Sequence, residues 1–307
     1  MTETKKDFID LTQFNKNELI FLIEDGINKK NISSNNGMAS VDEDACAKDK
    51  ILATIFEKPS TRTRFSFETA MYQLGGKTIY ANMSDMQLGR GETIDDTAKV
   101  ISRYVDIAML RTNKHSTLEN FAKNSSIPVI NGLTDKSHPC QVLADLITVK
   151  EKIGDIENKS YVWFGPANNM LTSWIHAAQI IGFELRICSP KDYSVDNNLV
   201  SGFPNITTDL DPNDAAKDCD CIITDTWFSM GEDDNDQKRK ILEPYRVDAN
   251  KISMASSDAI FLHCLPAHRG EEISEEVLEG RSSRIFDQAE NRLHVQHALL
   301  AVLLGGI

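Results

Sequence analysis

Residues 60–64, which read Ser-Thr-Arg-Thr-Arg, gather three hydroxyls and two guanidinium groups within five positions. Planar guanidinium groups suit phosphate oxygens. An apolar run at 51–56 precedes the motif, and apolar residues with helical spacing follow it at 67–74. The motif is therefore expected between a strand and a helix N-terminus, where free N–H groups and the helix dipole favour anions. It lacks the Gly-Lys-Ser/Thr of a nucleotide P-loop, so it predicts a small phosphorylated substrate, with a helix cap and a solvated basic face as the alternative.

A second set of polar residues lies near position 138. His138 precedes a helix expected over 139–152, and Arg111 follows a strand expected over 106–110. The helix dipole favours a neutral imidazole at this position. Together with Arg111 and Thr63, it could stabilise charge that develops on a carbonyl oxygen, and Gln141 could bind an amide. A structural cap is the alternative for His138.

Two further candidates follow predicted strands in the second half of the chain. Asp225 comes after the strand 221–224 and suits a substrate ammonium, although a solvated loop is an equal alternative. Cys264, next to His263, could be a covalent nucleophile or a polar contact that positions an amine. We favour the polar contact because no Asn or Asp orienter is near in sequence. The acidic run 232–236 is expected to be a solvated loop edge and not a metal site.

The alternation of strands and helices along the whole chain indicates an α/β fold. We expect two parallel-sheet α/β domains with the active site in the cleft between them. The first covers 1–147 and the second covers 148–288, and a C-terminal helix at about 289–307 packs back onto the first. An opening helix at about 16–30 and a polar loop at 31–40 are also expected. The candidate residues follow predicted strands, which is where open α/β sheets bind ligands.

Composition restricts the possible functions. The 307 residues carry a net charge of −13 and are 41% hydrophobic, which argues against nucleic acid or an anionic membrane as partner. No apolar stretch is long enough to span a membrane, and the N-terminus lacks the apolar core of a signal peptide. The six cysteines are scattered, which predicts reduced thiols and a cytoplasmic protein, not zinc or disulfides. The absence of Gly-x-Gly-x-x-Gly argues against a dinucleotide cofactor.

Three motifs together resemble one known family. The Phe-x-x-x-Ser-Thr-Arg-Thr-Arg of 56–64, the His-Pro-Cys-Gln of 138–141 and the His-Cys-Leu-Pro-Ala-His-Arg-Gly of 263–270 are similar to those of the aspartate/ornithine carbamoyltransferases. The Ser-Met-Gly of 229–231 narrows the resemblance to the branch that acts on ornithine. The match covers essentially the whole chain. One departure is Gly-Pro-Ala at 165–167, where the family usually has Gly-Asp-Gly, which puts the local geometry there in question.

The resemblance implies transfer of the carbamoyl group from carbamoyl phosphate to the δ-amino group of L-ornithine, giving citrulline and phosphate in arginine metabolism. It implies no metal or organic cofactor, and a homotrimer in which the Gln87 loop reaches a neighbouring subunit's site. The catalytic residues it implies are Arg111, His138 and Cys264. The carbamoyl phosphate-binding residues it implies are Ser60, Thr61, Arg62, Thr63, Gln87, Arg111, His138, Gln141, Cys264, Leu265 and Arg292. The ornithine-binding residues it implies are Asn169, Asp225, Ser229 and Met230.

Several alternatives stay open from the sequence. An enzyme for aspartate would need cationic groups for a second carboxylate, and one for putrescine would not need the Ser-Met-Gly loop. An enzyme for N-acylated ornithine would need room for the acyl group. A non-catalytic protein that binds carbamoyl phosphate or phosphate would keep the motif at 60–64 but lose Asp225 and Cys264.

Overall fold

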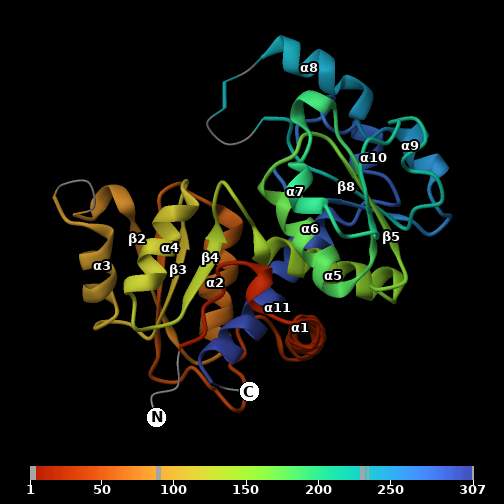
Figure 1. The fold of residues 1–307 in the computed structure, drawn as a ribbon. Helices are drawn as coiled ribbons and strands as arrows, with labels where there is room; N and C mark the ends of the chain where they lie inside the picture. Colours follow the sequence, from red (N-terminus) through yellow and green to blue (C-terminus); the bar gives the residue numbers. More distant parts are fainter. Residues whose placement is uncertain (1–4, 88–90, 229–231, 234, 306–307) are drawn as a thin grey trace. The chain divides into compact units, whose positions relative to one another are not determined.

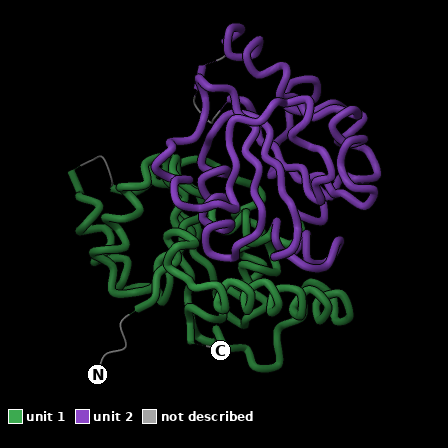
Figure 2. Tube along the Cα trace, turned by 45° about the vertical axis from the view of Figure 1, so that its right-hand side comes forward, with its two compact units in different colours: residues 1–144, 290–307 green, residues 145–289 purple. Residues whose placement is uncertain are grey.

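The computed structural model describes residues 5–87, 91–228, 232–233 and 235–305. The chain divides into two compact units, coloured separately in Figure 2. Unit 1 contains residues 1–144 and 290–307, and unit 2 contains residues 145–289. Both boundaries fall inside helices, α5 (Pro139–Ile153) and α11 (Ile285–Leu303).

Unit 1 is built on a four-stranded parallel sheet with the order β2-β1-β3-β4. Its strands are β1 (Ile51–Phe56), β2 (Lys77–Asn82), β3 (Ile107–Arg111) and β4 (Val129–Leu133). The connecting helices are α2 (Thr61–Gln73), α3 (Ile94–Ile101) and α4 (His115–Asn124). Five of the six residues of β1 are buried, as expected for a strand covered on both faces.

Helices cover both faces of this sheet (Figure 1). Helices α3 and α4 pack on one face, where Ala98, Leu118 and Phe121 meet Ile55 and Leu110 of the sheet. Helix α2 lies on the opposite face together with α1 (Lys16–Asn36). The polar loop expected over 31–40 is therefore wrong for residues 31–36, which continue α1 up to Gly37.

Partly buried charged contacts hold the C-terminal end of α11 within unit 1. The carboxylate of Asp42 lies 2.8 Å from Lys29 Nζ of α1 and 3.1 Å from His297 Nε2 of α11. Lys30 Nζ donates to Asn291 Oδ1 at 2.9 Å. These contacts add to the packing of Val295, Leu299 and their neighbours, and they fix the face of α11 that carries Arg292.

Unit 2 is built on a five-stranded parallel sheet with the order β7-β6-β5-β8-β9. Its strands are β5 (Ser160–Phe164), β6 (Glu184–Cys188), β7 (Ile206–Thr207), β8 (Cys221–Thr224) and β9 (Ile260–His263). Its other helices are α6 (Asn169–Ile181), α7 (Asn197–Val200), α8 (Asp236–Leu242), α9 (Ala249–Met254) and α10 (Glu275–Leu278).

The core of unit 2 contains buried aromatic rings on both faces of its sheet. Tyr161 of β5 packs against Phe183, which follows α6, and against Trp174 of α6, with ring centroids 4.4 and 5.3 Å away. The other face packs Ile222 and Val277 together with Phe164 and Phe261. The prediction of two parallel-sheet α/β domains is thus confirmed.

Each sheet has a point where the order of its strands reverses. In unit 1, β1 lies between β2 and β3, and in unit 2, β5 lies between β6 and β8. Ligands in open α/β sheets bind beyond the carboxyl ends of the strands at such a switch point. Among the described residues, no helix is long and apolar enough to cross a membrane.

Candidate active site

The loop after β1 places the Ser-Thr-Arg-Thr-Arg motif at the switch point of unit 1. Ser60 is the N-cap of α2, and its hydroxyl accepts a hydrogen bond of 3.4 Å from the backbone N–H of Thr63. Thr61 is exposed, Arg62 is half-buried and Thr63 is buried. The first turn of α2 therefore presents backbone N–H groups beside these side chains, as the sequence predicts for an anion site.

Two arginines from distant parts of the chain converge on Thr63. Its Oγ1 accepts hydrogen bonds of 3.2 Å from Arg111 at the end of β3 and of 3.2 Å from Arg292 of α11. Arg292 also donates to Gln141 Oε1 at 2.8 Å. Because Thr63 Oγ1 already accepts twice, its proton remains to be donated to a ligand. We call Thr63, Arg111, His138, Gln141 and Arg292 the arginine site.

His138 lies immediately before α5 and is 4% exposed. Burial lowers its pKa well below 6.5, and the charges of Arg292, Arg111 and Arg62 lower that pKa further. The lowered pKa agrees with the neutral imidazole expected from the sequence, and burial and the neighbouring cations are causes that the sequence did not indicate. A neutral imidazole can donate one hydrogen bond to a carbonyl oxygen without placing another charge there.

The remaining residue predicted for this side is Gln87. It is exposed and ends the described part of the loop after β2, since residues 88–90 lie outside the described residues. Among the described residues of unit 1, no hydrogen bond or ion pair joins Gln87 to the arginine site. Its assignment to a shared site stays a prediction.

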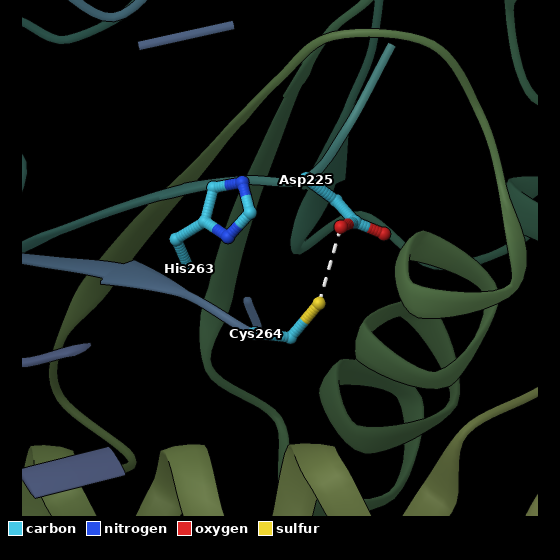
Figure 3. A group of neighbouring side chains, drawn as sticks. All are labelled: Asp225, His263 and Cys264. Atoms are coloured by element: carbon cyan, nitrogen blue, oxygen red, sulfur yellow. Dashed lines mark hydrogen bonds between the residues drawn. The ribbon is translucent and has the colours of Figure 1, made fainter. Parts of the chain in front are cut away.

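Asp225 follows β8 at the switch point of unit 2 and is 8% exposed. Its carboxylate accepts hydrogen bonds from the Cys264 thiol at 3.1 Å, from Asn168 Nδ2 at 2.8 Å and from the backbone N–H of Thr226 at 2.8 Å. Figure 3 shows the thiol of Cys264 directed at this carboxylate. The tertiary fold thus supplies the acidic partner of Cys264 that the neighbouring sequence lacks. We call Asp225, Asn168 and Cys264 the carboxylate–thiol site.

The loop after β9 holds Cys264 and Leu265 through a buried histidine. His263 Nδ1 accepts from the backbone N–H of Leu265 at 2.9 Å, and His263 Nε2 lies 3.1 Å from Glu272 Oε1. The same carboxylate oxygen accepts from the backbone N–H of His268 at 2.6 Å. Leu265 has a φ of 58°, so its backbone is in the left-handed region. The sequence analysis does not identify Glu272, because an acidic pair at 271–272 resembles ordinary surface charge.

The Gly-Pro-Ala turn at 165–167 is followed by a regularly capped helix N-terminus. Gly165 has the positive φ of this turn, 123°, and the backbone N–H of Ala167 donates to Tyr193 at 2.8 Å. Asn168 caps α6, accepting from the backbone N–H groups of Met170 and Leu171. The side chain that reaches Asp225 is therefore that of Asn168, whereas the predicted ornithine ligand Asn169 is the first residue of α6.

Two predictions concern the segment that follows Phe228. Ser229 and Met230 lie outside the described residues. The described residues of the acidic run 232–236 are exposed, as expected for a solvated loop edge, and within it Glu232 pairs with Lys238 and Asn235 caps α8.

Among the described residues, two groups have the proximity to hold a metal ion. In each group, one ligand atom per residue lies within 4.8 Å of the others: Asp225, His263 and Cys264 in one, and His268, Glu271 and Glu272 in the other. Cys264 already donates to Asp225, and both ring nitrogens of His263 have partners. Glu271 is paired with Arg239 at 3.0 Å. A metal would therefore have to displace existing contacts in both groups.

Comparison with known proteins shows similarity over both units. Residues 6–151 match the family described as aspartate/ornithine carbamoyltransferase, carbamoyl-P binding domain, and residues 157–303 match its Asp/Orn binding domain. A protein of Caulobacter vibrioides named ornithine carbamoyltransferase is 48% identical over 308 residues, with 98% of each chain covered.

Solved structures agree with the sequence comparison. The ornithine carbamoyltransferase of Burkholderia thailandensis superposes with a TM-score of 0.88 at 43% identity, covering 98% of this chain and 99% of that one. The ornithine carbamoyltransferase of Pyrococcus furiosus gives a TM-score of 0.92 at 41% identity, covering 100% of this chain and 99% of that one.

Proposed function

The chain belongs to the aspartate/ornithine carbamoyltransferase family, and we propose that it transfers the carbamoyl group of carbamoyl phosphate to the δ-amino group of L-ornithine. The products are L-citrulline and phosphate, and the reaction serves arginine biosynthesis. One observation carries the proposal. A pair of buried guanidinium groups lies at one switch point, and a buried carboxylate with a thiol lies at the other.

The first domain, residues 1–147 with the returning C-terminal helix, binds carbamoyl phosphate in this proposal. Its phosphate is held at the N-terminus of α2 by Ser60, Thr61, Arg62 and Thr63, where the helix dipole adds to the charge of the arginines. Arg111, His138 and Gln141 bind the carbamoyl end, with Arg292 completing the pocket and Gln87 contributed by a neighbouring subunit. The two donors that already converge on Thr63 support this arrangement, because they are oriented before the ligand arrives.

The second domain, residues 148–288, binds ornithine in this proposal. Asn169, Asp225, Ser229 and Met230 hold the amino-acid end of ornithine, and Cys264 and Leu265 line the reaction centre. The buried carboxylate of Asp225 suits an ammonium group. The hydrogen bond from Cys264 to Asp225 supports a polar role for the thiol, because it ties the thiol to the carboxylate that holds the acceptor in this proposal.

The chemistry follows from these groups. The δ-ammonium of ornithine, with a pKa near ~10, first loses a proton. The nitrogen lone pair then forms the new C–N bond to the carbamoyl carbon, and negative charge collects on the carbonyl oxygen. Arg111 and the neutral His138 stabilise this oxyanion as hydrogen-bond donors. The intermediate collapses, the C–O bond to phosphate breaks, phosphate leaves with the electron pair, and the nitrogen gives up its second proton. Catalysis rests on positioning and electrostatics, with no metal or organic cofactor.

We also propose that the protein is a cytoplasmic homotrimer formed through unit 1. Helix α2 carries Phe65 and Tyr72, which are 67% and 52% exposed, and they line a surface hollow together with Met38. The edge strand β2 exposes Ile79 to 50%. Large exposed apolar groups of this kind mark interaction surfaces. The six free cysteines are compatible with a reducing compartment.

The assembly can be tested by light scattering. Phe65→Glu combined with Tyr72→Glu should convert a trimer to monomers, because two charges would be buried in the subunit contact. The matched control is Tyr104→Glu, since Tyr104 is 71% exposed and follows α3 on the other face of the sheet. A monomeric wild-type protein, or a double variant that remains trimeric, contradicts this interface.

The function is tested by offering carbamoyl phosphate with ornithine, putrescine, aspartate and N-acetylornithine side by side, and measuring each carbamoylated product. A strong preference for ornithine supports the proposal. Preference for another acceptor would leave carbamoyl phosphate as the donor substrate and overturn ornithine as the acceptor. Binding of carbamoyl phosphate without turnover of any acceptor favours a non-catalytic binding protein.

A further inference from the structure

A lysine on α8 is buried beside the segment that follows Asp225. Lys238 is 5% exposed, and its Nζ lies 2.5 Å from Glu232 Oε1. The same Nζ lies 4.9 Å from the ring centroid of Tyr193 and 5.1 Å from that of Phe228. An ammonium group over two aromatic faces and against one carboxylate is stabilised by cation–π and ionic contacts together.

Local structure holds Lys238 in this position. Asn235 caps α8 by accepting from the backbone N–H groups of Gln237 and Lys238. Lys238 and Leu242 are one turn apart, and both are buried, so this face of α8 packs inward. The helix is short, and its orientation therefore depends on these side-chain contacts.

A second cation of α8 contacts the same aromatic ring. Arg239 lies 5.0 Å from the ring centroid of Phe228, and its guanidinium forms an ion pair of 3.0 Å with Glu271. The ring of Phe228 is thus contacted by two neighbouring cations. Trp227, beside it, is 2% exposed and lies 5.9 Å from Arg246.

The anchored ring is connected to Asp225 by a short chain of hydrogen bonds. The backbone N–H of Thr226 donates to Asp225 Oδ1 at 2.8 Å, and the Thr226 hydroxyl donates to the carbonyl of Phe228 at 3.1 Å. Only Thr226 and Trp227 therefore separate Asp225 in sequence from the ring that Lys238 contacts. A shift of Phe228 would be passed on to Asp225 through Thr226.

We propose that Lys238 is a positioning residue for the amino-acid acceptor, which it serves by fixing Phe228 and Glu232 and so the segment 225–228. This inference rests on the proposed function. The side chain of Glu232 is 38% exposed, so removal of its lysine partner leaves no buried charge behind and costs little stability. A lysine that only stabilised the fold could therefore be replaced by methionine with little consequence, whereas a positioning lysine could not.

The test compares Lys238→Met with the matched control Lys240→Met, since Lys240 is exposed on the same helix. We expect Lys238→Met to raise the KM for ornithine about tenfold, while kcat and the KM for carbamoyl phosphate change less than about threefold. Lys238→Arg should restore most of the ornithine affinity, because arginine keeps the charge and the contact with aromatic rings. Phe228→Leu should reproduce the effect of Lys238→Met.

The outcomes separate positioning from folding and from the function itself. If Lys238→Met leaves the KM for ornithine unchanged, the inference is wrong. If it lowers kcat in proportion to the folded fraction measured by circular dichroism, with both KM values unchanged, Lys238 has a purely structural role and the inference is also wrong. If the wild-type protein itself does not carbamoylate ornithine, the proposed function fails first, and that failure is seen without any variant.

Discussion

The two switch points of this molecule have the same topology and opposite chemistry. In unit 1, Arg111 ends β3 beside the central strand β1, and in unit 2, Asp225 follows β8 beside the central strand β5. The two side chains are almost equally buried, at 9% and 8% exposed. The fold therefore determines where a ligand can bind, and the residue at the strand end determines the charge of that ligand.

The surroundings of the two residues extend the contrast. In the arginine site the two guanidinium groups are donors, and burial together with these cations lowers the pKa of His138. Asp225 is an acceptor that receives its hydrogen bonds from a thiol, an amide and a backbone N–H. An anionic donor substrate and a cationic acceptor can thus be bound by one chain whose overall net charge is −13.

Arg111→Met tests the cationic half of the comparison and should have the largest effect. In the proposed mechanism it removes a donor to the developing oxyanion, so kcat should fall by about 10³-fold, or ~4 kcal/mol in activation free energy. Steady-state assays with saturating ornithine measure this loss. The control is Arg103→Met, since Arg103 is exposed after α3. Near-normal turnover of Arg111→Met would remove the arginine from the mechanism.

Asp225→Asn tests the anionic half while keeping the shape of the side chain. Loss of the negative charge should raise the KM for ornithine by about 10²-fold and leave the KM for carbamoyl phosphate within about threefold. The control is Asp233→Asn, an exposed carboxylate further along the chain. A comparable loss of carbamoyl phosphate affinity would contradict the separation of the two sites.

Cys264→Ser sharpens the comparison by asking whether the thiol is an acceptor-side contact or a nucleophile. A serine hydroxyl can still donate to Asp225, so we expect a decrease in kcat of only about tenfold. Steady-state rates and mass spectrometry of the protein during turnover decide between the roles. A carbamoylated Cys264, or a loss greater than about 10⁴-fold, would restore the nucleophile interpretation.

His138→Asn tests whether the surroundings of His138 lower its pKa, which is seen in how the unfolding free energy depends on pH. The folded-state pKa of His138 lies well below 6.5, so between that pKa and 6.5 the unfolded chain binds a proton that the folded chain does not. Its contribution to stability is present above pH ~6.5 and decreases as the pH falls. Replacing it should reduce the rise in unfolding free energy from pH 5 to 6 by up to about 1.4 kcal/mol per pH unit.

Urea unfolding at several pH values measures this slope, with His268→Asn as the control because the side chain of His268 is 52% exposed. An unchanged slope in His138→Asn would mean that the imidazole is protonated in the folded protein. The arginines would then not set its charge, and the electrostatic contrast between the two switch points would be weaker than described.

The sequence alone determined the fold class, because strand and helix periodicities alternate along the whole chain. It also determined which residues end strands, and so identified Ser60 to Arg64, Arg111, His138, Asp225 and Cys264 as neighbours of strand ends. The shortest elements could not be predicted from the sequence. The two-residue strand β7 and the four-residue helices α7 and α10 bury too few residues to give a pattern. The end of α1 was missed because its last turns are polar.

Only the tertiary structure decided which of these residues meet. Thr63, Arg111 and Arg292 lie up to 229 positions apart, and their contact depends on how β1, β3 and α11 pack. Asp225 and Cys264 are 39 positions apart, and the parallel pairing of β8 with β9 brings them together. The buried Glu272 and Lys238 look like surface charges in the sequence, since burial of a charge depends on partners that no local pattern records. Local periodicity fixes elements, whereas contacts between distant residues follow from packing.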